Sequence, residues 1–266
     1  MATNAMHRAV EFRWIVVCVG SLLFSSITVG QDKKPVTIAG WGTVTDLAGD
    51  CTVKEQDGKL AVTVPGGVHD LNASAGGMKA PRVLKEIEGD FTVEVKVTGE
   101  FKPGEIEGSF RVRPFNGAGL LVWQDAGNYV RLERNVYWVK EHSEYVCYPP
   151  LLQRFKEGEE EEDICPAPTL YDNFFRARST WLRLERRKDE LTASYSRDGK
   201  EWTVAKTIAV ELSKKLRAGI AVINTSAQPF TVEFENLNLS SASVDAKRDG
   251  HGAGPTGNAA PVPPKR

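Results

Sequence analysis

Alternation of hydrophobic and polar residues is the dominant pattern in the middle of the chain. In the segment 91–97 (FTVEVKV), every second residue is apolar and the residues between them are polar or charged. The same period of two recurs in four further segments, 119–123, 129–133, 181–185 and 230–234. Successive residues of a strand point to opposite faces of its sheet, so each segment is predicted to be a strand with one buried face.

Turn signals separate these predicted strands. They are the pairs Asp57-Gly58, Gly66-Gly67, Gly89-Asp90, Pro103-Gly104 and Asp198-Gly199. Such pairs favour the backbone angles of tight hairpins. No segment of ten or more residues has the 3.6-residue hydrophobic period of an amphipathic helix. Many short antiparallel strands in one domain predict an all-β sandwich or barrel.

Both ends of the chain are expected to lie outside the fold. Residues 14–24 (WIVVCVGSLLF) form an apolar run that is too short to span a bilayer of about 30 Å, and a small-x-small cleavage signal follows at 28–30. We interpret residues 1–30 as a signal peptide, which predicts a secreted or periplasmic protein with no membrane span after cleavage. A buried helix or an uncleaved anchor is the alternative. Residues 241–266 are rich in Gly, Pro, Ser and Ala and are predicted to be a disordered tail, which leaves 35–240 as the folded domain.

Composition and charge narrow the class of protein. The chain has 266 residues, of which 41% are hydrophobic and 26% charged, so a fully disordered, collagen-like or polytopic membrane protein is excluded. Lys and Arg number 34 and Asp and Glu 35, for a net charge of -1. No excess of basic charge is present, and so no nucleic-acid partner is predicted.

Residues 141–171 break the alternation and are predicted to be an insertion. Its acidic run 157–163 holds six acids in seven residues and is predicted to be a solvated loop, or else a contact for a protein partner. In an oxidising compartment we expect Cys147 and Cys165 to form a disulfide that staples this loop, with Cys51 left as a small buried hydrophobe. The run lacks the spacing of an EF-hand loop. No cofactor or metal site is therefore predicted, although calcium is left open.

Two strand segments share one sequence pattern, 129–134 (YVRLER) and 181–186 (WLRLER). As antiparallel neighbours, they could pair Arg131 with Glu185 and Arg183 with Glu133. Their polar face is either stabilised by exposed ion pairs or serves as a floor for a ligand. The polar cluster at 69–72 either holds a turn or reaches a ligand. The candidate ligand-binding residues are Trp123, Gln124, Asp125, Tyr129, Arg131, Glu133, Trp181, Arg183, Glu185, His69, Asp70 and Asn72.

Several motifs together resemble a known family. They are residues 64–72 (VPGGVHDLN), 117–125 (GAGLLVWQD), 128–133 (NYVRLE) and 193–202 (ASYSRDGKEW). They resemble the family often labelled "regulation of enolase protein", within the concanavalin A-like lectin/glucanase superfamily. The resemblance implies a two-sheet antiparallel jelly-roll sandwich, to which the disulfide-stapled insertion loop would be this protein's own addition. The label is a poor guide to function, because an exported chain would not meet cytosolic enolase.

Catalytic motifs are absent from the sequence. Glucanases of the superfamily carry Glu-x-Asp-x-x-Glu on one strand, which places paired carboxylates on one face for hydrolysis, and no such motif occurs here. No nucleophile elbow, P-loop or HExxH motif is found either. We predict a non-catalytic, lectin-like module that binds a poly- or oligosaccharide. The alternatives are a glycan-degrading hydrolase of the same superfamily and an extracellular protein-interaction module.

Overall fold

The computed structural model describes residues 35–74, 77–104, 114–139, 144–164 and 178–241, all within one compact unit that begins at Pro35. The described part contains 17 strands and no helix, and therefore no helix that could cross a membrane. The predicted signal peptide and residues 242–266 of the predicted tail lie outside the described residues.

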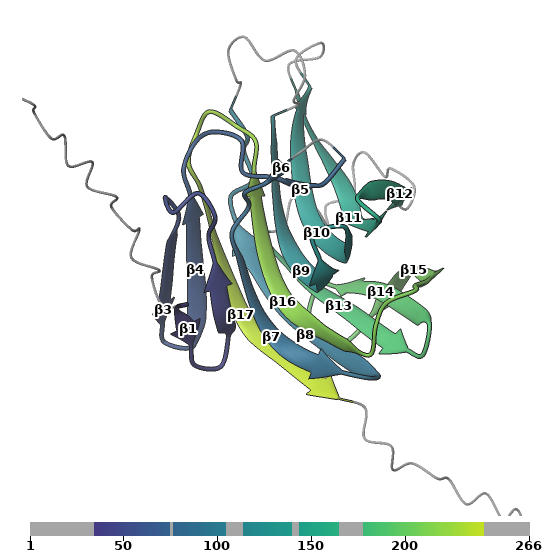
Figure 1. Cartoon of the computed structure of the whole chain (residues 1–266). Helices are drawn as coiled ribbons and strands as arrows, with labels where there is room; N and C mark the ends of the chain where they lie inside the picture. Colours follow the sequence, from purple (N-terminus) through teal and green to yellow (C-terminus); the bar gives the residue numbers. More distant parts are fainter. Residues whose placement is uncertain (1–34, 75–76, 105–113, 140–143, 165–177, 242–266) are drawn as a thin grey trace, which may run out of the picture. The chain divides into compact units, whose positions relative to one another are not determined.

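Fifteen of the strands form two antiparallel sheets packed face to face (Figure 1). The eight-stranded sheet has the order β1 (Thr37–Ile38), β2 (Gly42–Thr45), β7 (Arg82–Glu88), β16 (Lys215–Asn224), β9 (Phe115–Asp125), β10 (Asn128–Val139), β11 (Glu144–Lys156), β12 (Glu159–Ile164). The seven-stranded sheet has the order β15 (Thr203–Ala209), β14 (Glu190–Ser196), β13 (Ser179–Arg187), β8 (Phe91–Gly99), β17 (Phe230–Ser241), β4 (Lys59–Val64), β3 (Thr52–Gln56). A short hairpin of β5 (Leu71–Asn72) and β6 (Gly77–Met78) is separate from both.

The core between the sheets is formed by the residues that the alternation predicted to be buried. In β8, Phe91 and the valines at every second position are fully buried, while the residues between them are partly exposed. Strands β13 and β17 alternate in the same way. Burial of each large apolar side chain contributes about 1.5–3 kcal/mol, so the period of two largely determines this fold. The predicted all-β, two-sheet jelly-roll sandwich is confirmed.

Residues 144–164, predicted to be a stapled insertion loop, form β11 and β12 instead. Strand β11 pairs with β10 from Tyr129↔Phe155 to Val139↔Glu144, and so extends the eight-stranded sheet. The prediction was wrong because the acidic run has partners within the chain. Arg154 forms an ion pair of 3.1 Å with Glu161, which compensates part of the charge on the edge strand β12.

The predicted Cys147–Cys165 disulfide falls outside what the structure describes. Cys165 is not among the described residues, and for Cys147 only the backbone in β11 is described. The pairing therefore finds no support here and stays a prediction. Cys51 is a free cysteine and is partly rather than fully buried.

Candidate functional site

The eight-stranded sheet carries a second hydrophobic cluster on its outer face, which is turned away from the other sheet. Trp123, Tyr129 and Phe155 stack across β9, β10 and β11, with ring centroids 5.2 Å and 4.4 Å apart. Leu71 of β5 and Ala80 pack on this face as part of the same cluster. Residues 69–74 and 77–80 thus cover part of the outer face.

A buried polar network lies beside these rings. We call it the Arg131 network, and its members are Asp70, Asn72, Arg131, Glu133, Gln153 and Glu160. Arg131 Nη1 lies 3.4 Å from Asp70 Oδ1, and Nε lies 3.4 Å from Glu133 Oε1. The guanidinium also donates two hydrogen bonds to Gln153 Oε1, of which the one from Nε measures 2.7 Å.

The network continues from Gln153 to the edge of the sheet. Gln153 donates to Glu160 of β12 over 2.8 Å, and Asn72 Nδ2 donates to the other oxygen of Glu160 over 3.4 Å. Arg131 and Glu133 are only 3% and 1% exposed. The network therefore holds the covering segment against β10, β11 and β12, and its central ion pair is an interior one.

Two ionisable groups on β10 keep a fixed charge state. Burial opposes the charge of Arg131, but the carboxylates of Glu133 and Asp70 raise its pKa above the usual value, so the guanidinium stays charged. Burial raises the pKa of the Tyr129 hydroxyl, which stays neutral. That hydroxyl donates to the Leu71 carbonyl over 3.0 Å and accepts from the Ala73 N–H over 3.2 Å.

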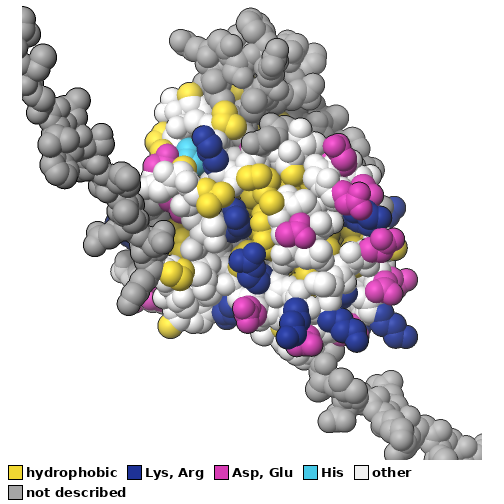
Figure 2. Space-filling view, in the orientation of Figure 1, with side chains coloured by type: hydrophobic (Ala, Val, Ile, Leu, Met, Phe, Trp, Pro, Cys, Tyr) yellow, Lys and Arg dark blue, Asp and Glu magenta, His cyan; other side chains and the backbone are white. Residues whose placement is uncertain are grey.

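An open groove of about 510 Å³ lies where β7, β9 and β16 meet. We call it the Trp123 groove, and its lining residues are Glu86, Ile87, Glu88, Trp123, Gln124, Lys215, Leu216 and Arg217. The strand registers place opposite charges side by side, with Glu86 next to Arg217 and Glu88 next to Lys215. Figure 2 shows basic and acidic side chains spread over this face of the protein, with hydrophobic side chains between them. The groove therefore combines an apolar base with exposed groups of both charges.

Trp123 forms a wall of this groove rather than an open stacking surface. It is 3% exposed, because Arg82 lies over its ring at 4.4 Å and Tyr129 stacks against it. Burial and the neighbouring charge of Arg217 lower the pKa of Arg82. Gln124 accepts the N–H of Ser213 over 2.9 Å, which fixes its position beside the groove. A ligand here would be held mainly by the charged and amide groups.

Trp181, Arg183 and Glu185 lie on β13, on the outer face of the other sheet. The cross-strand pairs expected between this strand and β10 are wrong, because the two strands belong to different sheets. Arg183 instead pairs with Glu94 of β8 over 2.6 Å and lies 3.7 Å over the ring of Trp202. The shared pattern indicated which residues share a face, but not which strands are neighbours.

The remaining candidate residues lie in different parts of the structure. Asp70 and Asn72 join the Arg131 network, whereas His69 turns to Asp50, with Nε2 3.1 Å from Oδ1. Asp125 holds the turn between β9 and β10, where it accepts the N–H of Gly127 over 2.8 Å and the amide of Asn128 over 2.9 Å.

Several residues of the network and the groove were not predicted. They are Glu86, Glu88, Gln153, Glu160, Lys215 and Arg217. The spacing Glu86-x-Glu88 and Lys215-x-Arg217 is a usable signal, since residues two apart in a strand share a face. That signal does not tell which strands adjoin.

The family is identified by comparison with family models. A model described as "Protein of unknown function (DUF1349)" matches residues 53–242. The chain belongs to this family. The label "regulation of enolase" is not shown by the family model or by the structures described below. No significant match was found among curated proteins.

Solved structures support the fold. A protein of Saccharomyces cerevisiae described as functionally unknown matches with a TM-score of 0.55 and 16% identity, over 76% of this chain and 97% of that one. A mutant of the GH43 protein BlXynB from Bacillus licheniformis matches with a TM-score of 0.53 and 12% identity, over 79% of this chain but only 38% of that enzyme. At these identities the likeness extends to the sandwich fold alone.

Proposed function

We propose that this protein is an exported, non-catalytic carbohydrate-binding module of the lectin-like type, and that the Trp123 groove is its sugar site. The observation that carries the proposal is the lining of the groove. Sugar hydroxyls are recognised by carboxylates, guanidinium and amide groups, and Glu86, Arg217 and Gln124 present all three at one hollow. A volume of about 510 Å³ falls within the usual range of ligand pockets, about 300–1,000 Å³.

The position of the groove supports the same proposal. Its charged residues sit on paired strands in the interior of the sheet, so their spacing is set by the strand registers rather than by a loop. Trp123 and Gln124 are the two sequence-predicted candidates that line it. Tyr129 stacks on Trp123, and Tyr129, Arg131 and Glu133 are buried on the neighbouring strand β10, where they would act as support.

The test is affinity electrophoresis of the purified protein in gels that contain neutral, acidic or sulfated polysaccharides, with and without calcium. We expect selective retardation by one class. Arg217→Met should weaken the affinity for that polysaccharide by about tenfold or more, because it removes a charged hydrogen-bond donor worth about 1.5–3 kcal/mol. The fold should persist, since Arg217 is exposed.

Arg183→Met is the matched variant on the opposite face. It removes the same charge from the other candidate strand and should leave retardation unchanged. A loss of binding in Arg183→Met but not in Arg217→Met would show that the groove is not the site. Uniform failure to bind any polysaccharide would contradict the proposed function itself.

An assay for reducing ends on the same purified protein distinguishes binding from hydrolysis. Glu86 and Glu88 point to the same side of β7, two residues apart, in the arrangement from which a carboxylate pair could act on a glycosidic bond. We expect no release of reducing ends from the retarding polysaccharide. Sustained release that disappears in Glu86→Gln or Glu88→Gln would establish the hydrolase alternative instead.

A further inference from the structure

Three potential metal ligands of different chemical type meet away from the groove. They are a carboxylate oxygen of Asp50, the Sγ atom of Cys51 and a ring nitrogen of His69, and these atoms all lie within 4.8 Å of one another. Thiolate, imidazole and carboxylate together form a donor set used for zinc and similar transition metals, whereas calcium and magnesium take oxygen ligands. The chemistry of the cluster thus favours a transition metal.

Two of the three separations between these atoms are close to those around a tetrahedral ion. Zinc–ligand bonds of about 2.0–2.3 Å at the tetrahedral angle place a nitrogen about 3.3 Å from an oxygen, and a sulfur about 3.5 Å from an oxygen. Here His69 Nε2 lies 3.1 Å and 3.2 Å from the two oxygens of Asp50. Cys51 Sγ lies 3.6 Å from Asp50 Oδ1. Two of the three ligand pairs therefore need almost no movement to bind the ion.

The backbone holds the three residues in place from two separate segments. Asp46 accepts the N–H groups of Gly49 and Cys51, over 3.0 Å and 2.9 Å, and so fixes the loop that carries Asp50 and Cys51. His69 exchanges two backbone hydrogen bonds with Asn224, at 2.9 Å and 3.0 Å. The loop connects β2 of one sheet to β3 of the other. An ion bound here would link the loop between β2 and β3 to the segment that contains His69 and packs on the outer face.

We propose that Asp50, Cys51 and His69 bind a divalent transition metal ion of the zinc type, with the fourth position open to water. In the absence of metal, the Nε2 proton of His69 is shared with Asp50; the ion replaces this proton and that of the thiol. Among the described residues these three form the cluster, and the carboxylate of Asp46 also lies close to the Cys51 thiol. The site is independent of the proposed sugar groove.

The surroundings of Cys51 are negatively charged. The carboxylate of Asp46 accepts its N–H over 2.9 Å, and Oδ1 of Asp50 lies 3.6 Å from its Sγ atom. These carboxylates attract a dication, and a coordinating thiol is deprotonated when it binds the ion.

The test is titration of the purified full chain with Co²⁺, followed by competition with Zn²⁺. We expect a thiolate-to-cobalt charge-transfer band, visible d–d bands of a four-coordinate ion, and a rise in Tm on addition of Zn²⁺. Cys51→Ser should abolish the charge-transfer band, and Asp50→Asn should weaken Zn²⁺ affinity by more than about tenfold. Both side chains are only partly buried or exposed, so both variants should fold.

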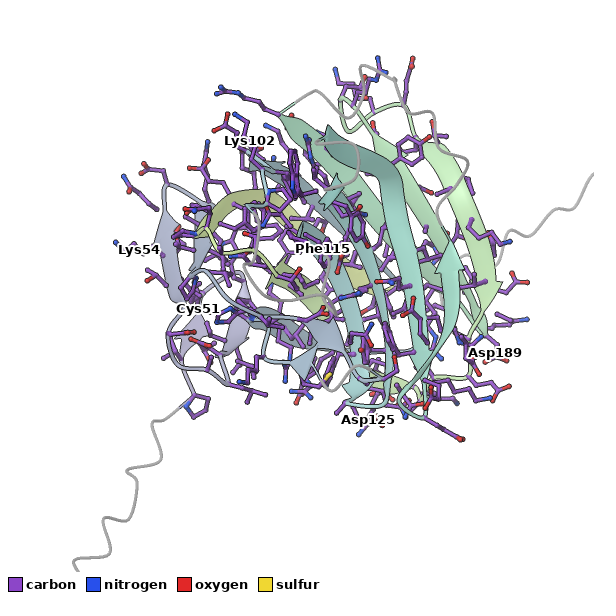
Figure 3. All side chains as sticks on the ribbon, turned by 90° about the horizontal axis from the view of Figure 1, so that it is seen from above. Cys51, Lys54, Lys102, Phe115, Asp125 and Asp189 are labelled. Carbon is purple, nitrogen blue, oxygen red and sulfur yellow. The ribbon has the colours of Figure 1, made fainter. Side chains whose placement is uncertain are left out.

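Asp189→Asn is the control, because this exposed carboxylate lies on the other side of the protein from Cys51 (Figure 3). It should bind Co²⁺ as the original chain does, and so should the groove variant Arg217→Met. An absent charge-transfer band would overturn the proposal. A band that persists in Cys51→Ser would do the same, since it would assign the thiolate to another cysteine.

Discussion

Replacing Arg131 by methionine should lower the free energy of unfolding by about 3–5 kcal/mol, the usual cost of removing one partner from a buried ion pair. Methionine keeps most of the side-chain volume, so the decrease in the free energy of unfolding measures mainly the effect of removing the charge. The substitution leaves the carboxylates of Glu133 and Asp70 without the guanidinium, and the amide of Gln153 without its donor. Urea denaturation at neutral pH, followed by tryptophan fluorescence, measures the loss.

Arg183→Met is the matched comparison. Arg183 has the same place in the shared sequence pattern, but its side chain is 26% exposed and its ion pair with Glu94 lies on the outer face of the seven-stranded sheet. Its loss should cost about 1 kcal/mol, as is usual for an exposed pair with an added aromatic contact. Equal costs for the two variants would show that burial does not distinguish them.

This pair of strands shows how far the sequence can be interpreted. Alternation correctly assigned the buried and exposed faces of β8, β13 and β17, because that assignment depends only on the local period of two. For β10 the same pattern predicted a polar face that resembles the one on β13. The structure buries that face under residues 69–74 and 77–80, which are distant in the sequence. A local pattern contains no information about such a cover.

The acidic run and the metal-ligand cluster were missed for related reasons. Charge alone predicted a loop at 157–163, yet Gln153 and Arg154 of the neighbouring strand provide partners for Glu160 and Glu161. The cluster joins Cys51 to His69 across 18 residues, without a short motif spacing. Only the strand order, with the backbone pairing of His69 and Asn224, brings the segments together.

Gly119→Ala should be the other strongly destabilising change, with a loss of at least about 3 kcal/mol, at the upper end of the cost of overpacking. A Cβ atom at this position of β9 would lie 2.0 Å from the Leu132 carbonyl oxygen and 2.8 Å from the Glu133 Cα of β10. Both are backbone atoms, so no side-chain rotation can relieve the clash. The two strands would have to separate.

The matched control is Gly99→Ala on β8, where the nearest atom to the added Cβ is the Thr231 carbonyl oxygen at 3.3 Å. In a strand, alanine is normally better than glycine by about 0.5–1 kcal/mol, so this variant should stay within about 1 kcal/mol of the original chain. Urea denaturation of both proteins measures their free energies of unfolding. A large loss in Gly119→Ala alone would show that the added Cβ forces the two strands apart. A Gly119→Ala protein as stable as Gly99→Ala would mean that β9 and β10 can move apart without loss. In that case the close strand contact next to Glu133 would not be what holds the Arg131 network in position.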